Sequence, residues 1–471
     1  MFHISFCSNE AYAKYTAVLI TSIIQSTDSA KRFRDFFVTN ERERESLNPK
    51  KSIKNFHLDS YPKRDYDSLS DDERREGYIF HIISDFLSDD SRVRLTKLAK
   101  DLSVIYPCEI RIHIGDDALF SGLPRLNGNY LTYFRFFIPR FMPQNYAVCL
   151  YLDIDMFVVG DLRELFTLDM GEKCVGVVKD YIVRNSLRKK PKLIAKRSGF
   201  KDICFTGTHF NAGFLLLNLP EWKKQNIVQK CFEVMANYRL DTHDQDTLNA
   251  VIVEQNRLKL PFEFNLLPRA FLQSICNDES NHFKFDYTRE EMDFALKNPV
   301  IFHFTSACAK QWQNPKICNV QGQNISLLWW EVALKTPRFA NILQSEFGQL
   351  SANSDKNFEN RVAIYLLKCV KNPLGFFALP FVVAKIFGKN PKEILESRKF
   401  SESSAKSFGG ESCDLHKLSP SDYNFAFELF HLCQKSWHKR KRGDLLILPI
   451  RAIKLKTRHN RYGINRIINN S

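Results

Sequence analysis

Two kinds of hydrophobic pattern alternate along the first two-thirds of the chain. Short apolar runs predict strands at residues 2–6, 78–83, 109–114, 148–152, 173–178, 214–217 and 300–304. Apolar positions at helical spacing predict helices at residues 13–26, 90–102, 129–139 and 241–254, the last with Asp and Thr suited to its N-cap. The run 148–152 shows no polar alternation, which is typical of a strand buried on both faces. This alternation of strands and helices predicts an α/β fold with a mostly parallel sheet.

Changes in composition divide the chain into domains. We expect an α/β domain over residues 1–315, a helical extension over 316–396, a linker and helix over 397–430, and a tail over 431–471. The polar stretch 39–77 interrupts the first domain, either as a solvated helical excursion or as a partly disordered loop. We expect this insertion to have no catalytic duty. A chain of 471 residues, 44% of them hydrophobic, is long enough for this arrangement.

Positive charge gathers at the end of the chain. The formal net charge is +15, and residues 431–471 carry +10 of it, from 11 Lys and Arg and one Asp. Because this tail alternates basic and apolar blocks, we favour peripheral attachment to an anionic membrane, where each cation contributes about 1 kcal/mol. A flexible tail that only improves solubility is one alternative, and nucleic-acid binding is a less favoured one. The basic segment 184–201 is either a solvated loop or a lid over an anionic substrate.

The sequence also bears on the compartment. We expect neither a secretory leader nor a membrane span, because no apolar run approaches about 18 residues. The 12 Cys include no Cys-x-x-Cys pair, which fits a reducing compartment. We therefore expect a cytoplasmic protein at the inner face of the cytoplasmic membrane.

Polar side chains that follow the apolar runs are the candidate site. Asp153 and Asp155 come directly after the run 148–152, and His303 lies in the run 300–304. Because the carboxyl ends of parallel strands meet at one edge, we expect Asp180, Asn211 and residues 244–246 in the same crevice. Two carboxylates and an imidazole leave positions open for phosphate oxygens, and the nitrogen ligand favours Mn²⁺ over Mg²⁺. Taken alone, such an Asp pair is more often a solvated strand end, and such a His a core residue.

Six motifs follow one another over residues 1–315. They are Ser8-Asn9-Glu10-Ala11-Tyr12, Tyr133-Phe134-Arg135, Leu150-Tyr151-Leu152-Asp153-Ile154-Asp155, Phe210-Asn211-Ala212-Gly213, Asp244-Gln245-Asp246, and His303-Phe304-Thr305 with Lys310-Gln311-Trp312. In this order and spacing the chain resembles glycosyltransferase family 8, the retaining transferases that use UDP-sugars. Within the family it is similar to the bacterial branch that adds glucose or galactose to lipopolysaccharide. Six ordered motifs are far more specific than one Asp pair.

The resemblance implies a GT-A fold with a mixed, mostly parallel sheet and a C-terminal helical extension. Asp153, Asp155 and His303 would bind Mn²⁺, or else Mg²⁺, together with the diphosphate of UDP. The other implied contacts are Asn9 at the uracil edge, Tyr12 on its ring, Arg135, Asp180, Asn211 and Ala212 at the donor sugar and ribose or phosphate, Lys310 at the diphosphate, and Ser8, Ile154 and Ser306 elsewhere in the UDP-sugar site. Gln245 would lie on the β-face of the sugar with Asp244 beside it, so these two are the candidate catalytic residues.

The chain departs from the family pattern at three residues, and its segment 303–310 is longer than usual by about one residue. Asn9 stands where the family usually has an acid, Ala11 where it often has Asn, and Gln311 where it usually has Pro. The first two concern uracil recognition, and the third concerns the diphosphate loop.

These observations predict a metal-dependent retaining transferase that moves glucose or galactose from UDP to a lipopolysaccharide or other lipid-linked saccharide. Because the Gln245 amide is a poor nucleophile, we favour a front-face reaction, with Asp244 or Asp246 as nucleophile the alternative.

Two other classes of protein remain as alternatives. One is a phosphotransferase of the haloacid-dehalogenase type with Asp153 as nucleophile, although that class carries its Asp pair near the start of the domain. The other is a non-enzymatic membrane-surface protein with a decayed transferase domain, against which the intact Asp153, Asp155 and His303 argue.

Overall fold

The computed structural model describes part of the chain, in two compact units. The described residues are 1–37, 58–123, 130–180, 192–196, 199–205, 208–240, 242–268, 287–305, 310–314, 317, 319 and 324–354. The first unit comprises Met1–Leu267, Glu279–Thr305 and Val332–Asn341, and the second comprises Pro268–Asp278, Ser306–Glu331 and Ile342–Ser471. The predicted linker and basic tail lie outside the described residues, and the predicted domain boundaries stay predictions.

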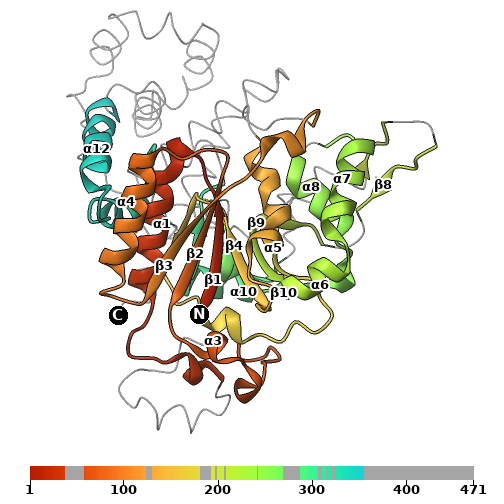
Figure 1. Cartoon of the computed structure of the whole chain (residues 1–471), viewed down its shortest axis with the longest axis horizontal. Coiled ribbons are helices and arrows are strands. Elements are labelled where there is room, and N and C mark those ends of the chain that lie inside the picture. The colour runs from red at the N-terminus through yellow and green to blue at the C-terminus, as the bar shows by residue number, and fades with distance from the viewer. Residues whose placement is uncertain are drawn as a thin grey trace, which may run out of the picture. The chain divides into compact units, whose positions relative to one another are not determined.

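The first unit is built on a seven-stranded mixed sheet (Figure 1). Its strands, in spatial order, are β10 (Arg257–Leu260), β6 (Val175–Lys179), β9 (Phe210–Asn218), β4 (Val148–Leu152), β1 (Phe2–Cys7), β2 (Tyr78–Ser84) and β3 (Cys108–Ile114). Only β9 is antiparallel to its neighbours, so the other six strands run in one direction. Two short antiparallel pairs accompany the sheet: β5 (Met156–Val158) with β11 (Ile301–His303), and β7 (Lys192–Leu193) with β8 (Ile203–Cys204).

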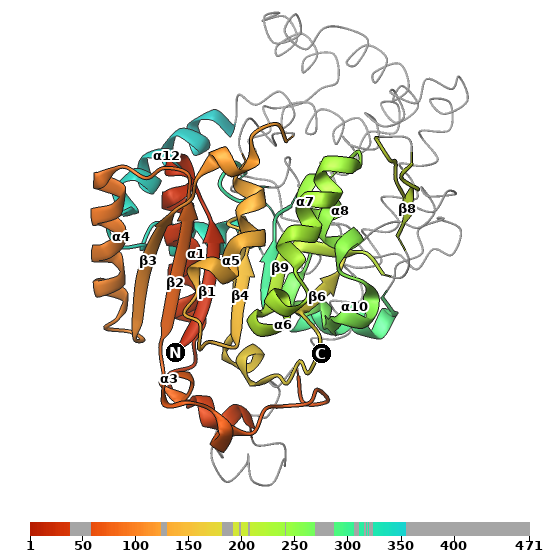
Figure 2. The same ribbon diagram turned by 45° about the vertical axis from the view of Figure 1, so that its right-hand side comes forward.

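The described residues also form α-helices and 3₁₀ helices. The α-helices are α1 (Ala13–Ser26), α3 (Asp71–Arg74), α4 (Asp89–Leu102), α5 (Ile138–Phe141), α6 (Leu219–Lys224), α7 (Ile227–Asn237), α8 (His243–Val251), α10 (Arg289–Lys297), α11 (Ile325–Ala333) and α12 (Ala340–Ser354). The 3₁₀ helices are η1 (Glu10–Tyr12), η2 (Phe33–Phe37), η3 (Tyr66–Ser68), η4 (Asp117–Phe120), η5 (Leu131–Phe137), η6 (Arg163–Thr167), η8 (Glu254–Asn256) and η9 (Phe262–Asn265). Figures 1 and 2 show α1 and α4 beside the β1–β3 half of the sheet, and α6, α7 and α8 beside the β9 half. Among the described residues, no helix combines the length and apolar character needed to cross a membrane.

The structure confirms the predicted α/β fold class but changes two elements. The segment predicted as one helix at 129–139 is mostly the 3₁₀ helix η5, followed by one turn of α-helix in α5. Strand β9 begins at Phe210 rather than 214, and it runs against its neighbours. Asn211 therefore reaches the carboxyl edge of the sheet from the start of an antiparallel strand, and not from the end of a parallel one. The start of β9 was not predicted because the polar Asn211 interrupts the apolar pattern there. The direction of a strand leaves no pattern in the local sequence.

The described half of the polar insertion, residues 58–77, is packed structure. Leu58 and Leu69 are buried, and the Leu58 N–H donates to Glu164 Oε1 at 3.1 Å. Helix α3 begins with a capping box between Ser70 and Glu73. The second half of this insertion is thus neither a disordered loop nor a free excursion.

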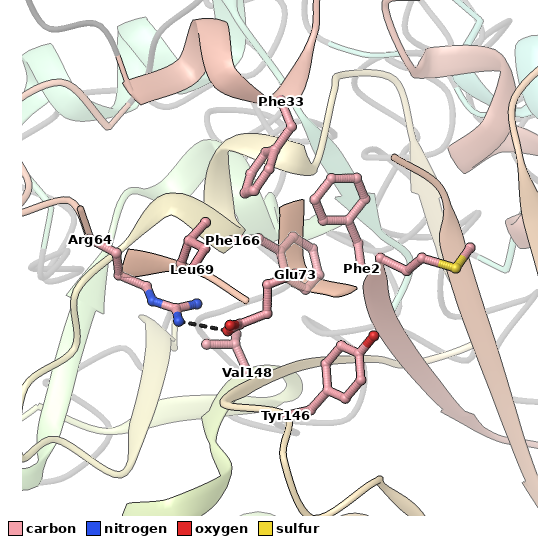
Figure 3. A pocket seen from close by; sticks show the side chains of 9 residues that line it. Phe2, Phe33, Arg64, Leu69, Glu73, Tyr146, Val148 and Phe166 are labelled. Atoms are coloured by element: carbon pink, nitrogen blue, oxygen red, sulfur yellow. Dashed lines mark hydrogen bonds and ion pairs between the residues drawn. The ribbon is translucent and has the colours of Figure 1, made fainter. Parts of the chain in front are cut away.

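A small cavity lies beside this segment, at the amino end of β1 (Figure 3). Phe2, Phe33 and Tyr146 line it, and Arg64 Nη2 pairs with Glu73 Oε1 at 2.6 Å beside them. Its volume of about 20 Å³ admits a water-sized molecule, whereas small-molecule sites measure several hundred Å³. It is not a substrate site.

Three histidines form a row across β1, β2 and β3. His3 Nδ1 lies 2.8 Å from His81 Nε2, and His81 Nδ1 lies 2.9 Å from His113 Nε2. Burial is the main cause that lowers the pKa of His3 to about 3 and that of His81 to about 2, and nearby positive charge lowers them further. Both imidazoles therefore stay neutral in the folded protein near neutral pH.

We predict that this row makes the protein lose stability as pH falls below about 6.5. The unfolded chain protonates each imidazole near pH 6.5, whereas the folded chain does so only near pH 3 for His3 and pH 2 for His81. Each histidine should then lower the free energy of unfolding by about 1.4 kcal/mol per pH unit in this window. Urea unfolding between pH 6.5 and 5 measures the slope. The His81→Gln variant should show a clearly shallower slope, and an unchanged slope would contradict this account.

Candidate functional site

The register of two strand pairs brings the three predicted metal ligands together. In the β4–β9 pair, Leu152 lies opposite Phe214, so Asp153 follows opposite Gly213 and donates its N–H to the Gly213 carbonyl at 2.8 Å. In the β5–β11 pair, His303 lies opposite Met156, which places it beside Asp155. His303 Nε2 is 3.1 Å from Asp155 Oδ1 and 3.8 Å from Asp153 Oδ2. One ligand atom from each residue lies within 4.8 Å of the others.

Gly213 leaves room for this cluster. A Cβ atom at this position would lie 2.4 Å from His303 Cε1 and 2.6 Å from Asp153 Oδ2, both shorter than any ordinary contact. The glycine of the Asn-Ala-Gly motif is therefore required for close approach of strand β9 to the two ligands. A donor set of two carboxylates and one imidazole suits a divalent cation of the manganese type.

Asp153 is oriented by hydrogen bonds to one of its two oxygens. The Tyr151 hydroxyl donates to Asp153 Oδ1 at 2.6 Å, and Arg135 Nη2 donates to the same oxygen at 3.0 Å. The other oxygen, Oδ2, faces His303. Burial and the Asp153 charge raise the pKa of Tyr151, so the phenol stays protonated and keeps donating.

The buried guanidinium of Arg135 joins Asp153 to helix α8. Arg135 Nη1 donates to the Ala212 carbonyl at 2.7 Å and pairs with Asp244 Oδ2 at 2.9 Å. Burial opposes the charge on Arg135, but the carboxylates of Asp153 and Asp244 outweigh it and raise its pKa. Burial also raises the pKa of Asp244 to about 6, although Arg135 acts in the opposite direction. Breaking such a buried ion pair from one side costs about 3–5 kcal/mol.

A chain of side-chain amides runs from Asp180 to His303. The Gln245 amide donates from Nε2 to Asp180 Oδ2 at 2.7 Å, and its Oε1 accepts from Ala212 N and Asn211 Nδ2, both at 3.1 Å. Asn211 Oδ1 accepts from Gly213 N at 3.0 Å and from Asn265 Nδ2 at 3.1 Å. Asn265 Oδ1 then lies 2.7 Å from His303 Nδ1.

Two backbone N–H groups contact these side-chain amides, and they determine the direction of every hydrogen bond among them. A backbone N–H can only donate, so the atoms facing Ala212 N and Gly213 N must be the amide oxygens of Gln245 and Asn211. Asn265 must therefore present its NH₂ group to Asn211 and its oxygen to His303. His303 must therefore donate from Nδ1 to Asn265, and in the neutral imidazole this leaves the lone pair on Nε2.

This tautomer makes the cluster suitable for a cation. The Nε2 lone pair faces oxygens of Asp155 and Asp153, so three electron-rich atoms converge. A proton on Nε2 could form a hydrogen bond with Asp155 but not with Asp153, because Asp153 Oδ2 lies 3.8 Å away, beyond hydrogen-bond distance. One divalent metal ion between them would be bound by all three atoms, so Asp153, Asp155 and His303 fit the role of metal ligands.

Four of the remaining predicted site residues lie in the segments that follow β1 and β4. Ser8, Asn9 and Tyr12 follow β1, which lies between β4 and β2 in the sheet. Asn9 Oδ1 accepts from Tyr12 N at 3.2 Å and so caps η1, while the Ser8 hydroxyl bonds to Thr16 at 2.8 Å. Ile154 lies in the turn between the two Asp residues.

Two predicted residues do not belong to the described part of the first unit. Lys310 belongs to the second unit, where its Nζ lies 5.8 Å from the centre of the Trp312 ring. Ser306 lies outside the described residues.

Asp246, considered as an alternative nucleophile, is engaged at the start of α8. Its two oxygens accept from the N–H and the hydroxyl of Thr242, each at 2.7 Å. Thr242 is the N-cap residue of α8, as the sequence predicts, but its side chain bonds to Asp246 and not to a backbone N–H of the first turn.

Asn265 and Tyr151 contact the candidate metal ligands, a role that the sequence did not suggest for either residue. Tyr151 could have been found, because residues two apart on a strand point to the same face and it precedes Asp153 by two. Asn265 is a single Asn after an apolar run, and no spacing in the sequence connects it to His303.

Comparison with known proteins places the chain in a family. The model of glycosyl transferase family 8 matches residues 3–315. A lipopolysaccharide 1,3-galactosyltransferase of Salmonella typhimurium is 31% identical over 189 residues, which cover 38% of this chain and 51% of that protein. A lipopolysaccharide 1,2-glucosyltransferase of Escherichia coli is 26% identical over 252 residues, covering 52% of this chain and 68% of that protein. The alignment thus spans about half the length of the first of these relatives.

A solved structure agrees on the fold. An apo structure of the WbbM bifunctional glycosyltransferase matches 73% of this chain and 51% of its own, with a TM-score of 0.50 and 18% identity. The molecule has a fold of the GT-A type. The chain belongs to glycosyl transferase family 8.

We predict that Gly213→Ala weakens binding of Mn²⁺ at least about tenfold, the lower end of what disturbing the surroundings of metal ligands usually costs. The added methyl group would displace His303 or Asp153, and both are held by further hydrogen bonds. Titration of free Mn²⁺ by electron paramagnetic resonance measures the affinity. Gly348→Ala, where a Cβ meets no atom within 4 Å, is the control and should bind as the parent does. Equal affinity in the two variants would show that this cluster is not the metal site.

Proposed function

We propose that this protein is a metal-dependent retaining glycosyltransferase that uses UDP-glucose or UDP-galactose. The observation that carries the proposal is the convergence of Asp153, Asp155 and the Nε2 lone pair of His303 at the carboxyl edge of the sheet. This edge is where α/β sheets bind nucleotide ligands. Membership of glycosyl transferase family 8 supports the reaction class, and it leaves the phosphotransferase alternative without support.

Mn²⁺ is the cofactor that we propose, held by the two carboxylates and the imidazole. When bound, it would neutralise the negative charge of the departing diphosphate as a Lewis acid. The chain's own part is to hold the ligands still: Tyr151 and Arg135 orient Asp153, and Asn265 orients His303. A site preorganised in this way acts without rearrangement during the reaction.

The hydrogen bonds of the candidate catalytic residues support a front-face reaction. Gln245 Oε1 already accepts two hydrogen bonds, and its Nε2 donates to Asp180. Asp244 is buried and paired with Arg135. Neither group is free to attack the sugar carbon, so we assign them positioning and electrostatic roles. The leaving oxygen of UDP would then accept the proton of the acceptor hydroxyl as the new bond forms on the same face.

The names of the relatives support a hexose donor and a saccharide acceptor. One is called a galactosyltransferase and the other a glucosyltransferase, and both names refer to lipopolysaccharide. We propose a lipopolysaccharide or another lipid-linked saccharide as the acceptor of this protein.

We predict that the protein releases UDP from UDP-glucose or UDP-galactose only when Mn²⁺ or Mg²⁺ is present. Asp153→Asn should lower this rate by at least about a hundredfold, the usual size of the loss of one preorganised electrostatic contact. Asp169→Asn is the matched control, because Asp169 is exposed and precedes β6 at the opposite edge of the sheet. A coupled assay for UDP gives the rates. Metal-independent release, or no release from any UDP-sugar, would count against the transferase.

We also propose peripheral attachment to an anionic membrane through residues 431–471, which carry a net charge of +10. This would hold the enzyme at the inner face of the cytoplasmic membrane, beside a lipid-linked acceptor. The full chain should sediment with vesicles that contain anionic lipid and remain in solution with neutral ones. A chain ending at residue 430 that still sediments with anionic vesicles would contradict this role of the tail.

A further inference from the structure

Asn265 lies next to the three candidate metal ligands and contacts one of them, His303, on the side of the ring away from Asp155. Its Oδ1 is 2.7 Å from His303 Nδ1, the ring nitrogen that faces away from Asp155. Its Nδ2 donates to Asn211 Oδ1 at 3.1 Å. We propose that Asn265 is a positioning residue that selects the tautomer of His303 and links the metal site to Gln245 through Asn211. The metal half of this inference rests on the proposed function, whereas the tautomer half does not.

The backbone holds Asn265 rigidly against His303. Asn265 is the last residue of η9. The next residue, Leu266, makes two backbone hydrogen bonds to β11. Its N–H donates to the Ile301 carbonyl, and its carbonyl accepts from His303 N, both at 2.9 Å. The Asn265 side chain is fully buried. These hydrogen bonds hold the segment that carries Asn265 against the strand that carries His303.

A carboxamide suits this place because its two ends differ. The amide oxygen of Asn265 must accept from His303 Nδ1–H, and its NH₂ group must donate to Asn211 Oδ1. Asn211 Oδ1 can only accept here, because the Gly213 N–H also donates to it. A carboxylate of the same shape offers acceptors at both ends, and a leucine offers neither. Asn265→Asp therefore keeps the contact to His303 and loses the contact to Asn211, whereas Asn265→Leu loses both.

The first experiment reads the tautomer of His303 without metal. The chain is labelled with ¹⁵N-histidine, and the His303→Ala spectrum identifies the ring signals of His303. We expect the Nδ1–H tautomer in the parent and in Asn265→Asp, and a mixture or the Nε2–H tautomer in Asn265→Leu. An Nδ1–H tautomer that persists in Asn265→Leu would overturn the proposal, whatever reaction the protein catalyses.

The second experiment measures the affinity for Mn²⁺ by electron paramagnetic resonance. Asn265→Leu should bind Mn²⁺ about 10–100-fold more weakly than the parent, the usual cost of removing a hydrogen-bond partner of a metal-bound imidazole. Asn265→Asp should stay within a few-fold of the parent, yet release UDP more slowly, because Asn211 loses its donor. Equal losses of affinity in Asp and Leu variants would overturn the proposal, since a merely structural role predicts that pattern.

Asn218→Leu is the control for loss of a partly buried Asn on the same sheet. Its Nδ2 donates to the carbonyls of Gly171 and Lys173, both at 3.0 Å, at the far end of β9. It should bind Mn²⁺ as the parent does, and circular dichroism of each variant confirms folding. If the parent itself binds no Mn²⁺, the proposed function fails in its metal part, while the tautomer experiment still decides the role of Asn265.

Discussion

The N–H groups of Ala212 and Gly213 donate into the side chains of Gln245 and Asn211, and the direction of the other amide hydrogen bonds in the site follows from these two. Through Asn265, the Gly213 N–H determines that His303 carries a proton on Nδ1, the ring nitrogen that faces away from the carboxylates. The same glycine lacks the Cβ that would collide with His303 and Asp153. A short stretch of strand β9 thus sets both the space and the polarity of the candidate metal site. This is possible because β9 runs antiparallel to its neighbours and begins at the edge where they end.

The protein itself neutralises part of the negative charge in the site. The buried guanidinium of Arg135 lies between the carboxylates of Asp153 and Asp244 and over the ring of Tyr151, 4.7 Å from its centre. Such a group stabilises little in net terms but costs several kcal/mol to unpair, so it gives the site one geometry rather than extra stability. Asp153 consequently has one oxygen bonded to protein and one directed at His303. This arrangement suits a carboxylate that binds a metal better than one that attacks a sugar or a phosphate.

Much of the fold was predictable, because strands buried on both faces are continuous apolar runs. The strands around Ile4, Phe80, Ile112 and Leu150 were predicted within two residues of their bounds. The reversed direction of β9 was not, since hydrophobic pattern is the same in both directions. Asp153, Asp155 and His303 could be named because carboxylates and imidazole after apolar runs are distinctive. Asn265 could not, because its role depends on a tertiary contact across 38 residues of sequence.

Calorimetric titration of UDP with and without Mn²⁺ tests most directly whether this edge of the sheet holds a metal together with a nucleoside diphosphate. Thermodynamic linkage requires that, if Mn²⁺ tightens UDP binding, UDP tightens Mn²⁺ binding by the same factor. We predict a factor of about ten or more in the parent chain, in line with typical coupling of 1–3 kcal/mol, and a factor near one in Asp155→Asn. UDP binding that is equally tight with and without Mn²⁺ in the parent chain would contradict the account.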